Sequence, residues 1–132
     1  MASYNYTILY VEDVQAALSF YEKAFGFHIK FITPDNSYGE LSTGATTLSF
    51  ASKTLAKTNL KNGFIESNLK DKPFGIEIGF TTDNVEATVN TAVDAGATIV
   101  EYPKTTSWGQ VIAYVRDPDG FLIEICTPVE TE

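Results

Sequence analysis

The order of structural elements expected in the first half of the chain returns in its second half. Residues 11–14 align with residues 82–85 at an offset of about 71 residues. In each half a β-prone segment leads to an Asp or Asn suited to capping a helix, and a glycine, Gly26 or Gly96, ends that helix. An internal repeat restricts the possible folds more strongly than the propensity of any single segment. We therefore interpret the chain as an internal duplication.

Each half is predicted to contain one helix and four strands, in the order strand, helix, strand, strand, strand. Apolar residues spaced three and four apart indicate the helices, and β-branched and aromatic runs between turn signals indicate the strands. Residues 27–32 alternate between apolar and polar side chains, which predicts a strand with one buried face. The expected strands cover residues 4–11, 27–32, 38–43 and 46–51 in the first half, and 74–82, 97–102, 109–115 and 121–126 in the second.

These elements predict an α+β fold made of two βαβββ modules in tandem. A length of 132 residues is ordinary for one compact domain. We expect a single domain over residues 1–132, with a first module at about 4–52, a linker at about 53–73 and a second module at about 74–127.

The charge of the chain disfavours two classes of partner. A net charge of −8 predicts repulsion from nucleic acids and from anionic membrane surfaces.

No N-terminal signal peptide is evident, and no apolar run reaches the ~20 residues that span a bilayer, which favours a cytoplasmic protein. Five of the nine basic residues lie in the linker. We expect a solvated loop there. The alternative is that these lysines bind an anionic ligand or a partner subunit.

Four motifs in order along the chain together resemble one known superfamily. Residues 10–14 and 19–27 are similar to the opening module of the vicinal-oxygen-chelate proteins, which include glyoxalases, bleomycin-resistance proteins and extradiol dioxygenases. Residues 94–96 end the second helix in the same manner, and residues 117–125 resemble the closing hairpin. The resemblance covers essentially the whole chain. It implies curved sheets that form an open cup, a small-molecule ligand and a homodimer.

The resemblance also implies where a metal would bind, because metal-dependent members place ligands on the first and last strand of each module. The corresponding residues here are Tyr6, Ser49, Glu77 and Glu124. Glu124 matches the usual carboxylate, and Glu77 stands where many members have histidine. Tyr6 and Ser49 depart from the pattern. The only histidine of the chain, His28, matches none of the four positions.

This set of donors is poor for a transition metal. A neutral phenol or hydroxyl is a weak ligand for Zn²⁺ or Ni²⁺, and extradiol dioxygenases hold Fe(II) with two histidines and a carboxylate. We expect no transition-metal cofactor and disfavour dioxygenase activity. The alternative is a divalent cation held weakly by Glu77 and Glu124 with added water.

The same positions predict an acidic, hydroxyl-bearing pocket. Two carboxylates brought together raise at least one pKa unless a cation joins them, and Trp108 would add cation–π attraction. A tryptophan before the penultimate strand resembles the metal-free, bleomycin-resistance-like members, which bind cationic, planar-ringed antibiotics. Alternatively, Trp108 packs in the core or a dimer contact, and Glu77 pairs with a linker lysine. The predicted ligand-binding residues are Tyr6, Ser49, Glu77, Trp108 and Glu124.

Three functions remain open at this point. The first is a small-molecule-binding protein without a transition metal, which sequesters a cationic aromatic compound as in antibiotic resistance. The second is a metal-dependent lyase or isomerase resembling lactoylglutathione lyase, with Glu124 and Glu77 as metal ligand and general base. The third is a non-catalytic interaction module.

Overall fold

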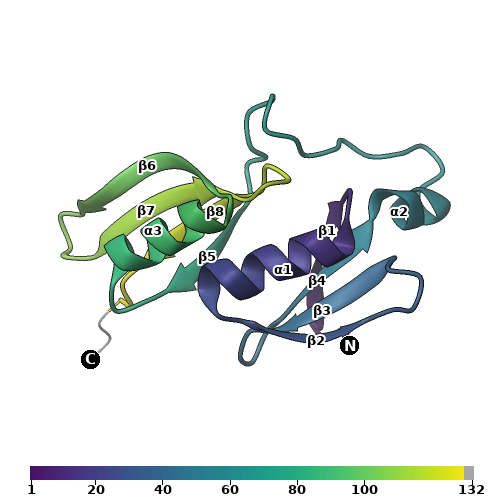
Figure 1. Cartoon of the computed structure of the whole chain (residues 1–132), viewed down its shortest axis with the longest axis horizontal. Coiled ribbons are helices and arrows are strands. Elements are labelled where there is room, and N and C mark those ends of the chain that lie inside the picture. The colour runs from purple at the N-terminus through teal and green to yellow at the C-terminus, as the bar shows by residue number, and fades with distance from the viewer. Residues whose placement is uncertain (130–132) are drawn as a thin grey trace. The chain divides into compact units, whose positions relative to one another are not determined.

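Each half of the chain folds into a four-stranded sheet with a helix on one face (Figure 1). The computed structural model describes residues 1–129 and forms two compact units, the second of which begins at Ser67. The first unit contains β1 (Tyr6–Val11), α1 (Val14–Phe25), β2 (His28–Ile32), β3 (Tyr38–Ser42), β4 (Thr47–Ser52) and α2 (Lys53–Asn59). The second contains β5 (Glu77–Thr81), α3 (Val85–Ala95), β6 (Thr98–Thr105), β7 (Val111–Arg116) and β8 (Leu122–Cys126). Within residues 1–129, no helix is long and apolar enough to cross a membrane.

The two sheets have the same topology. Their strand orders are β1-β4-β3-β2 and β5-β8-β7-β6, with the first pair parallel and the other pairs antiparallel in each sheet. The helix caps also repeat, because Asp13 accepts a hydrogen bond from the backbone of Ala16, and Asn84 accepts one from the backbone of Ala87. The predicted α+β fold of two tandem βαβββ modules is confirmed.

The core of the first unit lies between α1 and one face of its sheet. Leu18 and Tyr21 of the helix are almost completely buried, as are Leu41 and Phe50 of the strands. Gly39 on β3 leaves room for the helix, because a Cβ there would lie 2.6 Å from Cδ1 of Leu18. The opposite face of this sheet, which α1 does not cover, carries the alternate residues of the same strands.

The second unit repeats this arrangement with α3. Figure 1 shows α3 lying across the second sheet, where Val89 of the helix and Val115 and Ile123 of the strands are buried. Because side chains alternate along a strand, Tyr114 and Glu124 project to the other face. We refer to this uncovered side as the open face of the second sheet.

The strand β2 lacks the buried face that its alternating sequence predicts. Ile29 and Phe31 are exposed along with the polar residues between and before them. A shift in the pairing register between Ile29 and Phe31, of the kind that a β-bulge produces, interrupts the alternation, and β2 lies at the edge of its sheet. The prediction of one buried face was therefore wrong.

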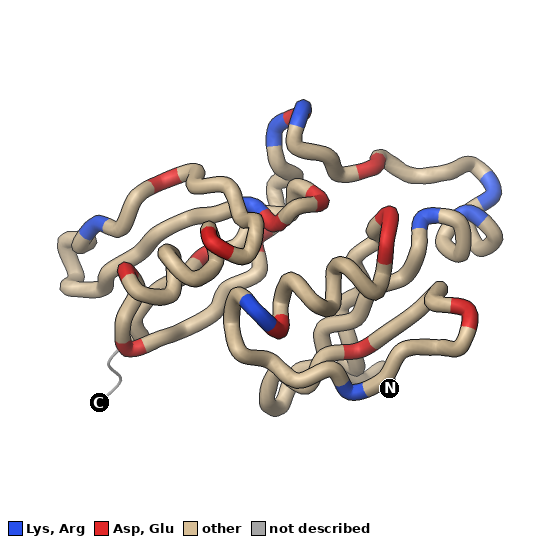
Figure 2. Tube along the Cα trace, viewed as in Figure 1, with Lys and Arg blue, Asp and Glu red and all other residues tan. Residues whose placement is uncertain are grey.

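The linker, expected to be a solvated loop, begins instead with the short helix α2. The Ser52 side chain accepts a backbone hydrogen bond at the start of this helix. Lys53 lies 3.6 Å from a carboxylate oxygen of Glu12 and 3.2 Å from one of Glu66. Figure 2 shows basic residues spread along the linker. Part of their charge is thus paired within the first unit.

The last part of the linker packs on the second unit through Arg116. The guanidinium of this buried arginine donates hydrogen bonds to the backbone carbonyls of Gly120 at 2.8 Å, Asp71 at 2.8 Å and Asn68 at 3.0 Å. Gly120 has a φ of 94°, and a Cβ on it would lie 2.8 Å from the backbone of Asn68. Residues 67–72 therefore sit tightly against the turn before β8.

Candidate functional site

Two carboxylates and a tyrosine meet on the open face of the second sheet. Glu77 lies on β5, Tyr114 on β7 and Glu124 on β8. The Tyr114 hydroxyl donates to Oε2 of Glu124 at 3.0 Å and makes a longer contact, 3.5 Å, with Oε1 of Glu77. One phenol thus links carboxylates from two other strands. We call Glu77, Tyr114 and Glu124 the carboxylate cluster.

The strand register explains why these three side chains meet. Directly paired residues of neighbouring strands face the same side of a sheet. Glu124 pairs with Tyr114 on one side and with Gly79 on the other. Glu77 lies two residues before Gly79, so its side chain projects to the same face as Glu124. The structure therefore brings the two predicted carboxylates together, and their part in ligand binding stays a prediction.

Proximity and burial change the acidity of the cluster. Burial, and then the neighbouring Glu124, raises the pKa of Glu77 above its ordinary value. Burial and the hydrogen bond to Glu124 raise the pKa of Tyr114 to about 12, so its hydroxyl keeps its proton at neutral pH. Across residues 67–129, no lysine or arginine forms an ion pair with either carboxylate. The alternative in which Glu77 pairs with a lysine therefore has no support within this unit.

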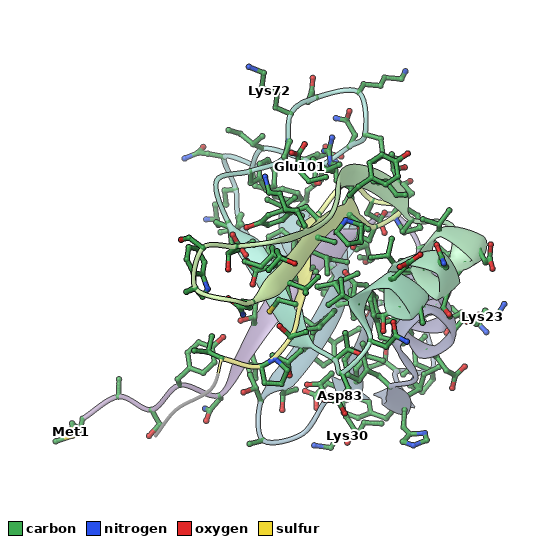
Figure 3. All side chains as sticks on the ribbon, turned by 90° about the vertical axis from the view of Figure 1, so that its left-hand side faces the viewer. Met1, Lys23, Lys30, Lys72, Asp83 and Glu101 are labelled. Atoms are coloured by element: carbon green, nitrogen blue, oxygen red, sulfur yellow. The ribbon has the colours of Figure 1, made fainter. Side chains whose placement is uncertain are left out.

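Trp108 lies at one end of the same sheet, beside a surface pocket of about 670 Å³. The side chain is 66% exposed, so it does not pack in the core of the unit. Its indole N–H donates to the side-chain oxygen of Gln110 at 2.8 Å, and the Gln110 amide donates to the backbone carbonyl of Thr127 at 2.8 Å. These bonds hold the indole at the rim of the pocket, whose lining also includes Asp83, labelled in Figure 3.

Cys126 connects the pocket with the carboxylate cluster. It lies on β8 two residues after Glu124, and its thiol interacts with both Glu124 and Gln110. Burial, and then the hydrogen bond with Glu124, raises the pKa of this thiol to about 11, so it is protonated and unreactive at neutral pH. The hydrogen bond that the structure shows for this thiol is to the backbone carbonyl of Phe80, at 3.8 Å.

The first sheet carries a related group on the face that α1 leaves open. The Tyr38 hydroxyl donates to Oε2 of Glu40 at 2.6 Å, and its oxygen lies within hydrogen-bond distance of Oγ of Ser49, at 3.0 Å. Burial is the main cause that raises the pKa of Tyr38. Tyr6 pairs with Thr47, two residues before Ser49, so its side chain faces the same side of the sheet. Ser49 is fully buried, whereas Tyr6 is half exposed. The hydroxyl predicted at Ser49 is therefore already bonded to Tyr38.

Tyr114, Tyr38 and Glu40 belong to these groups but were not predicted from the sequence. Tyr114 could have been found, because it and Glu124 lie at similar distances from the turn at 117–120 and so face each other across the hairpin. Glu40 gave no comparable signal. The family pattern directs attention to the first and last strand of each module, and Glu40 lies on β3 between them.

The donors of the second unit do not fit zinc or nickel. The carboxylate cluster offers two carboxylates and a neutral phenol, whereas those ions prefer imidazole and thiolate ligands alongside carboxylate. His28 is exposed on β2, in the other unit. Among residues 1–129, no group of three or more His, Cys, Asp or Glu side chains could hold a metal. These donor groups therefore differ from the imidazole-containing ligand sets of metal-dependent vicinal-oxygen-chelate proteins.

Replacing Glu77 with glutamine is expected to raise the melting temperature at pH 7, with the gain shrinking as the pH falls towards 4. A carboxyl whose pKa is raised on folding costs stability once the pH exceeds the raised value, because the folded state then loses a proton that it binds more tightly than the unfolded state. Below the ordinary pKa both states are protonated, and the cost vanishes. Melting curves of both proteins between pH 4 and pH 8 provide the measurement. Glu22→Gln on the exposed side of α1 is the control, and a difference that stays constant with pH would contradict the expectation.

The amino-acid sequence of this chain is similar to those of known proteins along most of its length. The sequence pattern of the Glyoxalase/Bleomycin resistance protein/Dioxygenase superfamily matches residues 3–125. The Virulence protein STM3117 of Salmonella typhimurium is 28% identical over 125 residues, which cover 92% of this chain and 81% of that protein. A probable lactoylglutathione lyase of Vibrio cholerae serotype O1 is 27% identical over 131 residues, which cover 91% of this chain and 86% of that protein.

Solved structures show the same fold at lower identity. A glyoxalase-related enzyme from Fulvimarina pelagi superposes with a TM-score of 0.81 at 18% identity, covering 97% of this chain and 89% of that chain. A glyoxalase/bleomycin resistance protein/dioxygenase family enzyme from Burkholderia phytofirmans gives 0.81 at 23% identity, covering 98% and 100%. The family pattern extends over both modules. The chain belongs to the Glyoxalase/Bleomycin resistance protein/Dioxygenase superfamily.

Proposed function

We propose that this protein binds a cationic aromatic small molecule without a transition metal, on the open face of the second sheet. The observation that carries the proposal is the carboxylate cluster, in which Glu77 and Glu124 share one phenol and no basic side chain of their own unit pairs with them. A bound cation would relieve the conflict between the two carboxylates. An anionic ligand would increase it.

The surroundings of the cluster suit the aromatic part of such a ligand. Tyr114 forms part of the cluster itself, and Trp108 stands at the rim of the pocket at the end of the same sheet. A cation within about 6 Å of an aromatic ring gains roughly 0.5–2 kcal/mol, and stacking of rings adds to this. A ligand whose cationic group lies at the carboxylate cluster can therefore place its planar ring against Tyr114, while Trp108 offers a second aromatic surface at the opposite end of the sheet.

The proposal is tested by measuring the melting temperature of the protein with several cations and one neutral compound, in the presence of a metal chelator. Benzamidine and proflavine are cationic aromatic probes, and benzamide is a neutral analogue with nearly the shape of benzamidine. At a concentration of about 100 times Kd, a ligand adds about 2.7 kcal/mol to the stability of the folded state. We expect the cations, and not benzamide, to raise the melting temperature by several degrees. Equal shifts with benzamide, or no shift with any cation, would contradict the proposal.

A second candidate function is a lyase, which the 27% identity to a probable lactoylglutathione lyase favours. The raised pKa of Glu77 makes it a stronger base than an ordinary carboxylate. An assay of lactoylglutathione formation, with and without added Zn²⁺ or Ni²⁺, separates this candidate from the binding protein. Turnover that disappears in Glu77→Gln would favour the lyase.

A further inference from the structure

Gly79 leaves an empty position beside the carboxylate cluster, on the edge strand β5. It lies on β5, two residues after Glu77, and pairs directly with Glu124 on β8. A Cβ added to Gly79 would meet a single neighbouring atom within 4 Å, Oε1 of Glu124, at 3.9 Å. A side chain at this position would therefore project onto the open face beside both carboxylates.

The fold itself does not require glycine at this position. The φ of Gly79 lies outside the left-handed region, so any residue can adopt its backbone conformation. Packing does not require it either, since 3.9 Å is an ordinary van der Waals distance. Glycine inside a strand costs roughly 0.5–1 kcal/mol relative to alanine, and it often marks a place where a ligand approaches the backbone closely.

The duplicated sheet provides an internal comparison. The residue that pairs with Ser49 in the first sheet, as Gly79 pairs with Glu124 in the second, is Ile8. The same position of the fold thus accepts a large β-branched side chain. The second sheet alone leaves this space empty, and it does so next to its two carboxylates.

We propose that Gly79 determines the specificity of the site by admitting a planar cation, which lies flat on the backbone of β5 between Glu77 and Glu124. The inference rests on the proposed function. Both carboxylates project from the same side of this strand pair, so a flat group resting on Gly79 has an acceptor at Glu77 and another at Glu124. An amidinium or guanidinium group can donate N–H hydrogen bonds to both in this position. A quaternary ammonium is bulkier and has no hydrogen to donate.

Titrations of wild type with benzamidine and with phenyltrimethylammonium test this assignment against Gly79→Val and Gly79→Ala. We expect wild type to prefer benzamidine by about tenfold, which corresponds to one charge-assisted hydrogen bond. Gly79→Val should weaken benzamidine binding at least tenfold and remove the preference, and Gly79→Ala should give a smaller loss in the same direction. Gly75→Val is the matched control, because a Cβ at Gly75 meets no atom within 4 Å and lies before the strand, and it should bind as wild type does.

Melting temperatures of the free proteins separate misfolding from loss of binding. Valine favours strands, so Gly79→Val is expected to melt no lower than wild type. If Gly79→Val fails to fold, the change in affinity and preference in Gly79→Ala decides the question. Wild-type affinity for benzamidine in folded Gly79 variants, with binding still lost in Glu124→Gln, would overturn the role of Gly79 and leave the proposed function intact. Failure of wild type to bind any cationic aromatic probe would overturn both.

Discussion

Replacing Arg116 with methionine is expected to lower the free energy of unfolding by about 3 kcal/mol, the largest effect on stability that we expect from a single polar residue. The guanidinium makes three hydrogen bonds to backbone carbonyls, at Gly120, Asp71 and Asn68. Methionine fills a similar volume but donates nothing, so the buried carbonyl of Gly120 loses its partner. The carbonyls of Asp71 and Asn68 can bond to solvent instead, but the linker then loses its packing against the second unit.

Urea unfolding followed by tryptophan fluorescence measures this loss. Lys104→Met removes the same charge from an exposed position on β6 and should change the free energy of unfolding by less than about 0.5 kcal/mol. Trypsin adds a second readout, because the bond after Lys70 in this segment should be cleaved faster once Arg116 no longer holds it, whereas Pro73 protects the bond after Lys72. Equal stability of Arg116→Met and Lys104→Met would show that the three hydrogen bonds contribute little.

Replacing Glu124 with glutamine is expected to weaken the binding of benzamidine by about 10- to 100-fold, since a hydrogen bond to a charged group contributes about 1.5–3 kcal/mol. The amide keeps the size of the side chain and can still accept from Tyr114, so the fold of the cluster is retained. The charge that attracts the cation is lost. The free protein should melt no lower than wild type, because the like-charge conflict with Glu77 is removed as well.

Calorimetric titration of wild type, Glu124→Gln and Glu86→Gln with benzamidine measures this effect. Glu86 lies on α3 and carries the same net charge change without touching the open face. Its replacement should alter Kd by less than twofold. A loss of affinity that is equal in both variants would assign the attraction to the overall negative charge of the protein and not to the carboxylate cluster.

The duplicated fold was predictable because its signals are local and occur twice. An Asx cap and a terminal glycine define each helix at the level of single residues, as Asp13 with Gly26 and Asn84 with Gly96 show. The exposure of β2 was not predictable, because the register shift that interrupts its alternation depends on how it pairs with β3. Alternation in a sequence reports a buried face only while the pairing stays regular.

The candidate site was predictable in part. Glu77 and Glu124 were found through the family pattern, and the structure places them on one face. Tyr114, which links them, was missed although its distance from the turn at 117–120 is similar to that of Glu124. The empty position at Gly79 required coordinates, since a sequence does not show which atoms surround a missing Cβ. The homodimer and the cytoplasmic location stay predictions.

We propose above that the carboxylate cluster binds an aromatic cation without a metal. The most direct measurement is calorimetric titration of chelator-treated wild type with benzamidine and with benzamide, at pH 7.5 and at pH 5. We expect one benzamidine to bind per chain at pH 7.5 and benzamide not to bind. Binding of benzamidine should be weaker at pH 5, because protons compete for the Glu77 carboxylate, whose pKa is raised. Absence of benzamidine binding until Zn²⁺ or Ni²⁺ is restored, or equal binding of benzamide, would contradict it.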